Sequence, residues 1–250
     1  MDFTRKVTHN GYKNPEKLKK YYHRVIKKIY SKPDSFDENY TQGRGSDYLF
    51  YDDDCLVSKS GGWVIPIILG LVSFGFLLIF FPGREEKSEI IDWVFFIISL
   101  LTLIFSFVYG FTMPKRKNIL NRKDGFITFS GFLWQPDITM EFRKTEFSYS
   151  TGGEDVVGAF QLQIIRPNKW QTFAIAGYVG IDCYENMSFI TWYMDRNRPL
   201  PPGTSFDGCR QKDFERRKSE GFPKPLYPSA IPTPEFTEEQ QKEREKIGGW

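Results

Sequence analysis

Two long apolar stretches, GGWVIPIILGLVSFGFLLIFF at residues 61–81 and WVFFIISLLTLIFSFVYGFTM at residues 93–113, contain no charged residue. An α-helix needs roughly 20 apolar residues to cross the hydrocarbon core of a bilayer. A helix also satisfies its own backbone hydrogen bonds, which lipid requires because it offers no water to replace them. The sequence therefore predicts two transmembrane helices, and the alternative is a buried helical hairpin of a soluble protein.

The charges beside these stretches predict the orientation of the hairpin. The connection at 82–92 is short, so the two helices run antiparallel and both chain ends lie on the same side. It contains Arg84 and Lys87, whereas the second stretch is followed directly by a denser set of basic residues: Lys115, Arg116, Lys117, Arg122 and Lys123. Lysine and arginine are enriched on the cytoplasmic side of membrane proteins. We expect a multi-pass protein with both termini in the cytoplasm and a short external loop at 82–92.

The N-terminal region, residues 1–46, is predicted to contain a basic amphipathic helix and a linker. Asn14 is the expected N-cap of a helix over 15–30. Apolar residues recur on one face at helical spacing, and the other face carries Lys17, Lys20, Arg24, Lys27 and Lys28. Such a helix fits an anionic membrane surface, or it packs on the cytoplasmic domain with its basic face in solvent. Nucleic acid is not an expected partner, because the net charge is only +3 and no nucleic-acid-reading motif is present.

Two similar segments border the apolar hairpin, and both are predicted to be β-hairpins. Residues 48–61, which overlap the predicted first hairpin at 47–60, align without gaps to residues 118–131. Each segment has apolar strands around a polar turn, and the Asp-Gly pair of the second is a strong hairpin signal. The three carboxylates at 52–54 could bind a divalent cation. Consecutive turn residues point in different directions, however, so a plain turn is the preferred interpretation.

Residues 114–198 are predicted to form an antiparallel sheet domain closed by a helix. Short strands separated by turn signals continue from 126 to 176. The helix is expected at 183–197 with Asp182 as N-cap, and its apolar content requires burial against the sheet. This pattern is similar to the pleckstrin-homology-like half-barrel with its C-terminal helix. The expected fold class is an α+β membrane protein, made of a transmembrane hairpin (61–81 and 93–113) and a cytoplasmic sheet domain.

The tail, residues 199–250, is rich in proline and is expected to pack in an extended form instead of making a second domain. A short helix is expected at 211–220, and residues 235–250 are expected to be disordered.

The side chains that enzymes and metal sites use are scarce. His9 and His23 are the only histidines, and the sequence has no HExxH, GxSxG or paired-cysteine motif. The three cysteines, at positions 55, 183 and 209, are widely spaced, which suits a reducing compartment better than a disulfide framework. We expect no catalytic site, no cofactor and no metal, although two carboxylates from distant positions can always meet in space.

The tail carries a motif that resembles a known family. MDRNRPLPPG at 194–203, followed by DFERRKSEGFP at 213–223, is similar to a family of bacterial two-span inner-membrane proteins often encoded beside effectors of type VI secretion systems. The likeness covers the hairpin, the sheet region and the tail. It implies an immunity protein that binds a cognate effector toxin and protects the producing cell. The family supplies no active-site residues to assign.

Two hypotheses follow for the function of this expected transmembrane protein of the lipid bilayer. An immunity protein would bind its effector through aromatic and arginine anchors, for which the candidates are Trp134, Trp170, Arg196 and Arg198. The tryptophans fit a core equally well, and the arginines could pin the tail to the sheet through backbone carbonyls. The alternative is a lipid-responsive or scaffolding protein that binds anionic head groups. The oligomeric state stays open, since neither apolar stretch contains a GxxxG motif.

Overall fold

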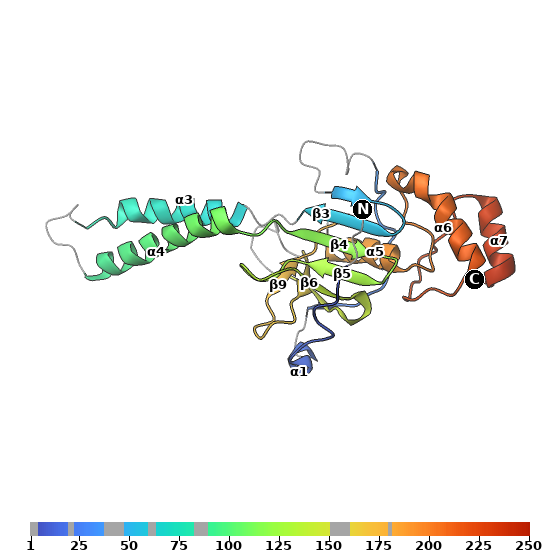
Figure 1. The fold of residues 1–250 in the computed structure, drawn as a ribbon, viewed down its shortest axis with the longest axis horizontal. Helices are drawn as coiled ribbons and strands as arrows, with labels where there is room; N and C mark the ends of the chain where they lie inside the picture. The colour runs from blue at the N-terminus through green and yellow to red at the C-terminus, as the bar shows by residue number, and fades with distance from the viewer. Residues whose placement is uncertain are drawn as a thin grey trace. The chain divides into compact units, whose positions relative to one another are not determined.

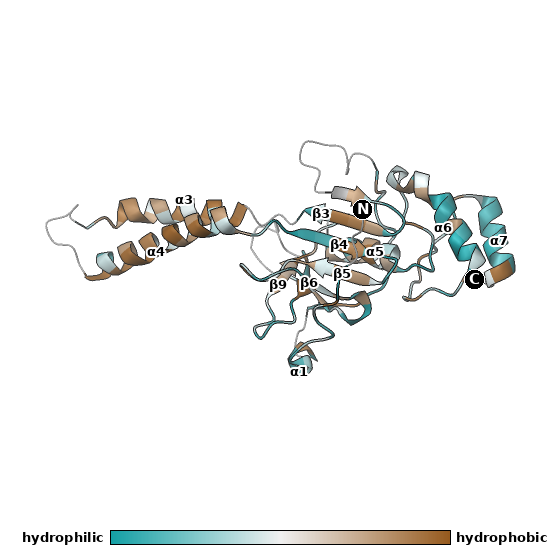
Figure 2. Cartoon of the chain, viewed as in Figure 1, coloured by the Kyte–Doolittle hydropathy of each residue, from teal (hydrophilic) through white to brown (hydrophobic). Residues whose placement is uncertain are grey.

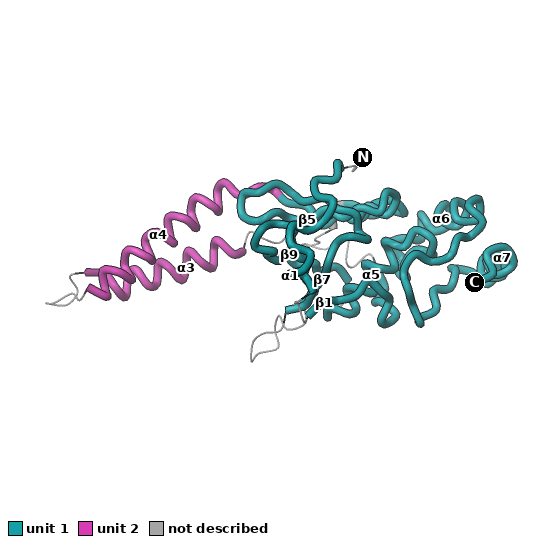
Figure 3. The backbone as a smooth tube through the Cα atoms, turned by 90° about the horizontal axis from the view of Figure 1, so that it is seen from below, with its two compact units in different colours: residues 1–59, 116–250 teal, residues 60–115 magenta. Residues whose placement is uncertain are grey.

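The structure, a computed structural model, describes residues 5–19, 23–37, 48–59, 64–82, 90–150, 161–179 and 182–250 (Figure 1). The chain divides into two compact units, which are coloured separately in Figure 3. Unit 1 comprises Met1–Lys59 and Arg116–Trp250, and unit 2 comprises Ser60–Lys115. Unit 1 contains two antiparallel sheets together with helices, so the predicted α+β class is confirmed.

The first sheet has five strands in the order of the chain: β2 (Tyr48–Tyr51), β3 (Cys55–Lys59), β4 (Lys117–Asn121), β5 (Phe126–Phe129) and β6 (Ile138–Glu141). The predicted hairpins are present as β2–β3 and β4–β5. Between them, β3 pairs with β4 from Cys55↔Asn121 to Lys59↔Lys117. Unit 2 is therefore an insertion in the connection between two neighbouring strands of one sheet.

The second sheet has four strands in the order β1 (Arg24–Val25), β7 (Phe147–Tyr149), β8 (Leu162–Ile165) and β9 (Phe173–Ile175). The sequence predicts one continuous sheet, and the structure differs because the 3₁₀ helix η1 (Phe142–Lys144) redirects the chain after β6. As a result, β7 pairs with β1 and β8. The half-barrel stays a prediction.

Helix α5 (Cys183–Met194) fills the core that the two sheets share. The carboxylate of Asp182 accepts the backbone N–H groups of Tyr184 and Glu185, which confirms the predicted N-cap. Met187, Ile190 and Tyr193 are fully covered, and they cluster with apolar side chains of both sheets. The helix ends at Met194, three residues before the predicted end, because Asp195 adopts an extended conformation.

The predicted N-terminal helix at 15–30 is wrong from Arg24 onward. Helix α1 is described over Pro15–Lys19, residues 20–22 lie outside the described residues, and Arg24–Val25 form β1 of the second sheet, where Val25 pairs with Phe147. Val25 and Ile29 are buried, and Ile29 forms an isolated bridge to Ser229. Val25 and Ile29, two of the apolar residues that suggested a helical stripe, thus contact β7 and the tail, because pairing with distant strands supplies the backbone hydrogen bonds.

The tail is ordered and helical at two places. Helix α6 (Asp207–Ser219) follows the 3₁₀ helix η2 (Thr204–Phe206), so the short helix predicted at 211–220 begins earlier. Helix α7 (Glu238–Gly248) occupies the segment that was expected to be disordered. Thr237 caps its first turn by accepting the Gln240 N–H, and Gly249 ends it at a φ of 69°.

Unit 2 is a hairpin of two apolar helices, α3 (Val64–Ile79) and α4 (Ile90–Thr112), which are hydrophobic along their length in Figure 2. Among the described helices, α4 alone is long and apolar enough to cross a membrane. Helix α3 has 16 described residues. Length and composition are weak evidence by themselves, because the core helix of a soluble protein passes the same test.

The burial pattern of unit 2 is the reverse of that in a soluble core. The buried residues of the two helices are one proline and three serines: Pro66, Ser73, Ser99 and Ser106. A Cβ added to Gly70 would lie 3.6 Å from the Cβ of Ser106, so the backbones approach closely there. Large apolar side chains point outward instead, with Leu71, Phe107 and Phe111 exposed by 68%, 61% and 85%. Small residues inside and large apolar residues outside are typical of helices packed in lipid.

Candidate functional site

The tail motif forms a buried network of charged side chains. Asp195 is fully covered, and its carboxylate accepts the backbone N–H groups of Asn197, Leu226 and Tyr227. Arg198 donates to Asp195 at 3.0 Å, to Thr233 at 2.9 Å and to the Tyr227 carbonyl at 2.7 Å. Arg198 therefore holds the tail against the end of α5, where the sequence analysis had proposed the sheet, and its side chain is only 7% exposed.

Asp213 on α6 is the centre of the same network. Its carboxylate accepts hydrogen bonds from three guanidinium groups, with N–O distances of 2.6 Å to Arg122 and 2.9 Å each to Arg216 and Arg217. Burial alone would raise the pKa of Asp213, but these three guanidinium groups outweigh it and lower the pKa. Arg217 also bonds Glu235, which accepts Arg244 from α7. The network thus ties the β4–β5 turn to α6 and α7.

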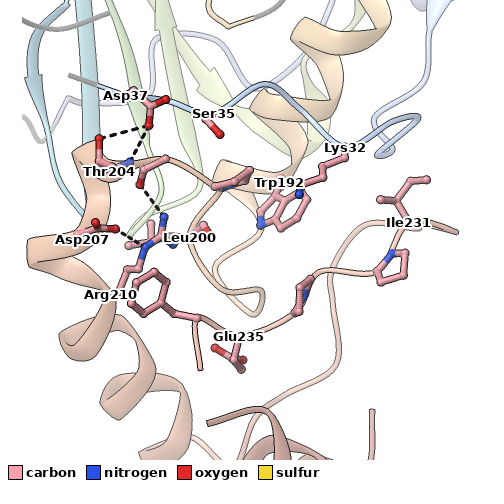
Figure 4. A pocket seen from close by; sticks show the side chains of 15 residues that line it. Lys32, Ser35, Asp37, Trp192, Leu200, Thr204, Asp207, Arg210, Ile231 and Glu235 are labelled. Atoms are coloured by element: carbon pink, nitrogen blue, oxygen red, sulfur yellow. Dashed lines mark hydrogen bonds and ion pairs between the residues drawn. The ribbon is translucent and has the colours of Figure 1, made fainter. Parts of the chain in front are cut away.

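A pocket of about 690 Å³ lies beside this network (Figure 4). Its walls come from three parts of unit 1: residues 32–37, the end of α5 with the chain to Arg210, and residues 231–236. Apolar side chains make up much of the lining: Trp192, Leu200, Pro202, Ile231, Pro232, Pro234 and Phe236. Polar and charged groups lie among them: Lys32, Ser35, Asp37, Thr204, Asp207, Arg210 and Glu235.

Backbone contacts fix the walls of this pocket. Gly203 has a φ of 129°, and a Cβ there would lie 2.3 Å from the backbone of Phe36, so only glycine fits this approach. Phe36 donates its N–H to the Pro202 carbonyl at 2.9 Å, and Asp37 accepts both the N–H and the hydroxyl of Thr204. Arg210 donates to three carbonyl oxygens of the loop before α6. The pocket is consequently preformed.

The chemistry available in the pocket suits binding. Arg210 is paired with Asp207, and Glu235 is paired with Arg217 and Arg244. Such mutually neutralised charges around an apolar, proline-lined wall fit an extended peptide or a protruding side chain. Within the described ranges, no group of three or more His, Cys, Asp or Glu side chains could hold a metal ion.

The cysteines are held as thiols. Burial raises the pKa of Cys55 to about 12 and that of Cys183 to about 11. Because the thiolate is the nucleophilic form, these two side chains are poorly suited to covalent catalysis.

The acidic run at 52–54 forms the β2–β3 turn. The Asp52 carboxylate accepts the backbone N–H groups of Asp54 and Cys55, and Asp53 pairs with Lys212 at 2.9 Å. These contacts match the interpretation of the run as a plain turn.

The predicted basic membrane-surface face is not formed by the described residues of that set. Lys17 lies on α1, and Lys20 lies outside the described residues. Arg24 pairs with Glu146 at 2.5 Å from strand β1. Lys27 donates to the Thr145 carbonyl, and burial lowers its pKa, while Lys28 lies over the ring of Tyr30. Arg24 lies on a strand, and Lys27 and Lys28 follow that strand, so these three residues do not share a helical face with Lys17.

The four predicted partner anchors separate into different environments. Arg196 pairs with Glu220 at a partly exposed position, next to the network that contains Arg198. Trp134 and Trp170 are exposed on loops of the sheets, so neither is a core residue. Three apolar side chains that the sequence analysis did not single out are exposed with them: Phe132, Phe173 and Ile175. The alternation of Phe173, Ala174 and Ile175 along one strand was the available signal.

Comparison of the chain with known protein families, with curated proteins and with solved structures finds no match.

Proposed function

We propose that this chain is a membrane-anchored binding protein. In this proposal α3 and α4 cross the bacterial inner membrane, both termini are cytoplasmic, and unit 1 binds a protein partner at the cytoplasmic face. The observation that carries the proposal is the reversed burial of the hairpin, with serine and proline side chains buried and large apolar side chains exposed.

Physical arguments support the bilayer as the environment of this hairpin. A contiguous apolar surface of this extent is rare on soluble proteins, because exposure to water is costly. Helix α4 has 23 residues, which span about 35 Å at 1.5 Å per residue, more than the roughly 30 Å hydrocarbon core. Helix α3 is shorter, and a bilayer accommodates such a segment by local thinning.

Membrane extraction tests the anchor. After expression in a bacterial host, the full chain is expected in the membrane pellet after an alkaline carbonate wash and in the supernatant after detergent. A green fluorescent protein fused after Trp250 should fluoresce, and alkaline phosphatase inserted at Ser88 should be active. Release by carbonate would contradict the anchor, and the opposite reporter pattern would contradict the orientation alone.

For the partner, we propose a cognate type VI effector that the chain neutralises by direct binding. The family resemblance of the tail motif points to this class of partner, and the preformed pocket offers an apolar wall for an anchor side chain. We propose a binding role without catalysis, because Asp207, Arg210 and Glu235 of the pocket already have partners within the chain.

A pocket variant tests this binding. Phe236 is 64% exposed at the pocket edge, so Phe236→Asp should leave folding intact. If the pocket holds an anchor, affinity for the effector encoded beside this gene should fall by at least about 2 kcal/mol, roughly thirtyfold. Ile247→Asp on α7 is the control, since Ile247 is exposed and does not line the pocket. Equal affinities for both variants, by calorimetry in detergent, would exclude the pocket as the contact site.

A further inference from the structure

We propose that unit 1 has its own contact with the bilayer: an interfacial patch, composed of Phe132, Trp134, Trp170, Phe173 and Ile175, that rests on an anionic lipid surface. This inference rests on the proposed membrane anchor. It adds a second contact, made by the sheets, and assigns a role to two tryptophans that were candidates for partner binding.

The patch is built on the outer strand of the second sheet and on a neighbouring loop. Strand β9 is the last in its sheet, and it buries Ala174 while exposing Phe173 and Ile175 by 41% and 56%. Arg166 donates to the carbonyl oxygens of Phe173 and Ser130. This guanidinium group therefore holds β9 beside the loop that begins at Gly131 and carries Phe132 and Trp134.

The covalent chain sets how far this loop can lie from the end of α4. Arg116 donates to the Gly131 carbonyl at 2.5 Å. Arg116 follows Thr112, the last residue of α4, by four positions. Four residues reach at most roughly 14 Å when fully extended. If α4 ends at the membrane surface, Gly131 lies no farther from it than this backbone reach plus the length of the Arg116 side chain and its hydrogen bond.

The composition of the patch fits that location. Tryptophan is enriched at membrane interfaces, where its ring meets both hydrocarbon and polar groups. Trp170 is 71% exposed, and the ammonium group of Lys169 lies 5.5 Å from its ring centroid. Lys117 is also exposed, opposite Lys59 in the sheet. Basic groups near an anionic lipid surface strengthen binding to it.

An exposed apolar strand at a sheet edge also needs a cover. Such an edge pairs readily with another chain unless it is protected. A lipid surface covers the side chains, whereas a second copy of this chain would pair with the backbone of β9. The basic neighbours Lys117 and Lys169 favour the anionic lipid surface, and the second copy is an outcome of the test.

The test uses the full chain in nanodiscs that contain anionic phospholipid, with Cys209→Ser as background because Cys55 and Cys183 are buried. A bimane label is placed on Ile175→Cys, and a nitroxide near the head-group end of the acyl chains quenches it. The matched control is Ile247→Cys, an exposed isoleucine on α7, and α7 lies on the far side of unit 1 from β9 (Figure 1). Leu101→Cys at the centre of α4 reports on the anchor, and for this position the nitroxide is placed near the terminal methyl end of the acyl chains, at the bilayer centre.

Quenching at position 175 is expected to be several-fold stronger than at 247 and to fall when neutral lipid replaces anionic lipid. Quenching at 101 with equal values at 175 and 247 would overturn the patch and leave the anchor standing. Absence of quenching at 101 would instead overturn the proposed anchor. If the label at position 175 is shielded from the nitroxide only in nanodiscs that hold two copies, the patch serves self-association. That result overturns the lipid contact.

Discussion

Replacing Asp213 with asparagine is expected to lower the free energy of unfolding by about 3–5 kcal/mol, since it removes one partner of a buried ion pair. Asp213 and Arg122 are each 1% exposed at the side chain and lie 2.6 Å apart. Asparagine preserves the shape but leaves the Arg122 guanidinium without its counter-charge. Chemical denaturation of the full chain in detergent, followed by tryptophan fluorescence, measures the loss.

Glu220→Gln is the matched control for this prediction. Glu220 also pairs with two arginines, Arg196 and Arg216, but its side chain is 34% exposed. Solvent screens such pairs, so the expected loss is below about 1 kcal/mol. Similar losses for the two variants would show that burial of the network contributes nothing.

The same carboxylate predicts a pH dependence. Because the native pKa of Asp213 is lowered, its contribution to stability is fully present above the ordinary value of 3.8. The contribution is lost as pH falls below that value and through the native pKa. The Asp213→Asn variant should therefore lose less stability than the wild type on acidification.

Two lysines at the centre of α4, Leu101→Lys with Ile104→Lys, are expected to prevent stable membrane insertion. Each lysine costs about 2.5–3.5 kcal/mol at the middle of a transmembrane helix. Leu101 and Ile104 are exposed by 61% and 51%, so neither change disturbs packing within the hairpin. The measurement is the fraction of full-length protein that resists carbonate extraction.

This double variant separates the two interpretations of the hairpin. On a soluble protein, exposed leucine or isoleucine replaced by lysine is nearly neutral for stability and favours solubility. In a bilayer the same change removes the protein from the membrane fraction. Ile247→Lys on α7 is the control and should leave that fraction unchanged. Full retention of the double variant would contradict insertion of α4.

The elements that the sequence predicts correctly carry local signals. The two β-hairpins follow from apolar alternation around polar turns, and α5 follows from Asp182 placed before an apolar run. Helix α7 had such signals as well, because Thr237 and Gly249 stand at its two ends. The expectation of disorder came from the proline-rich sequence before α7, although the prolines end before the helix begins.

The elements that the sequence does not predict depend on distant partners. Strand β1 has two residues, and its pairing with β7 crosses more than a hundred positions of the chain. Likewise, the backbone of Phe36 lies against Gly203 at the wall of the pocket, and no local sequence pattern reveals this close approach. The burial of Arg198 also depends on how the tail folds back onto α5.

The pairing of Lys59 with Lys117 affects the order in which the protein assembles. Strands β3 and β4 can meet only when the ends of the inserted unit come together, and closing a flexible loop of that length costs about 3–4 kcal/mol of chain entropy. Packed helices hold their axes about 8–10 Å apart. In the proposed topology, a hairpin inserted first in the bilayer would therefore close this loop before the sheet forms, and the membrane would serve as a template for folding unit 1.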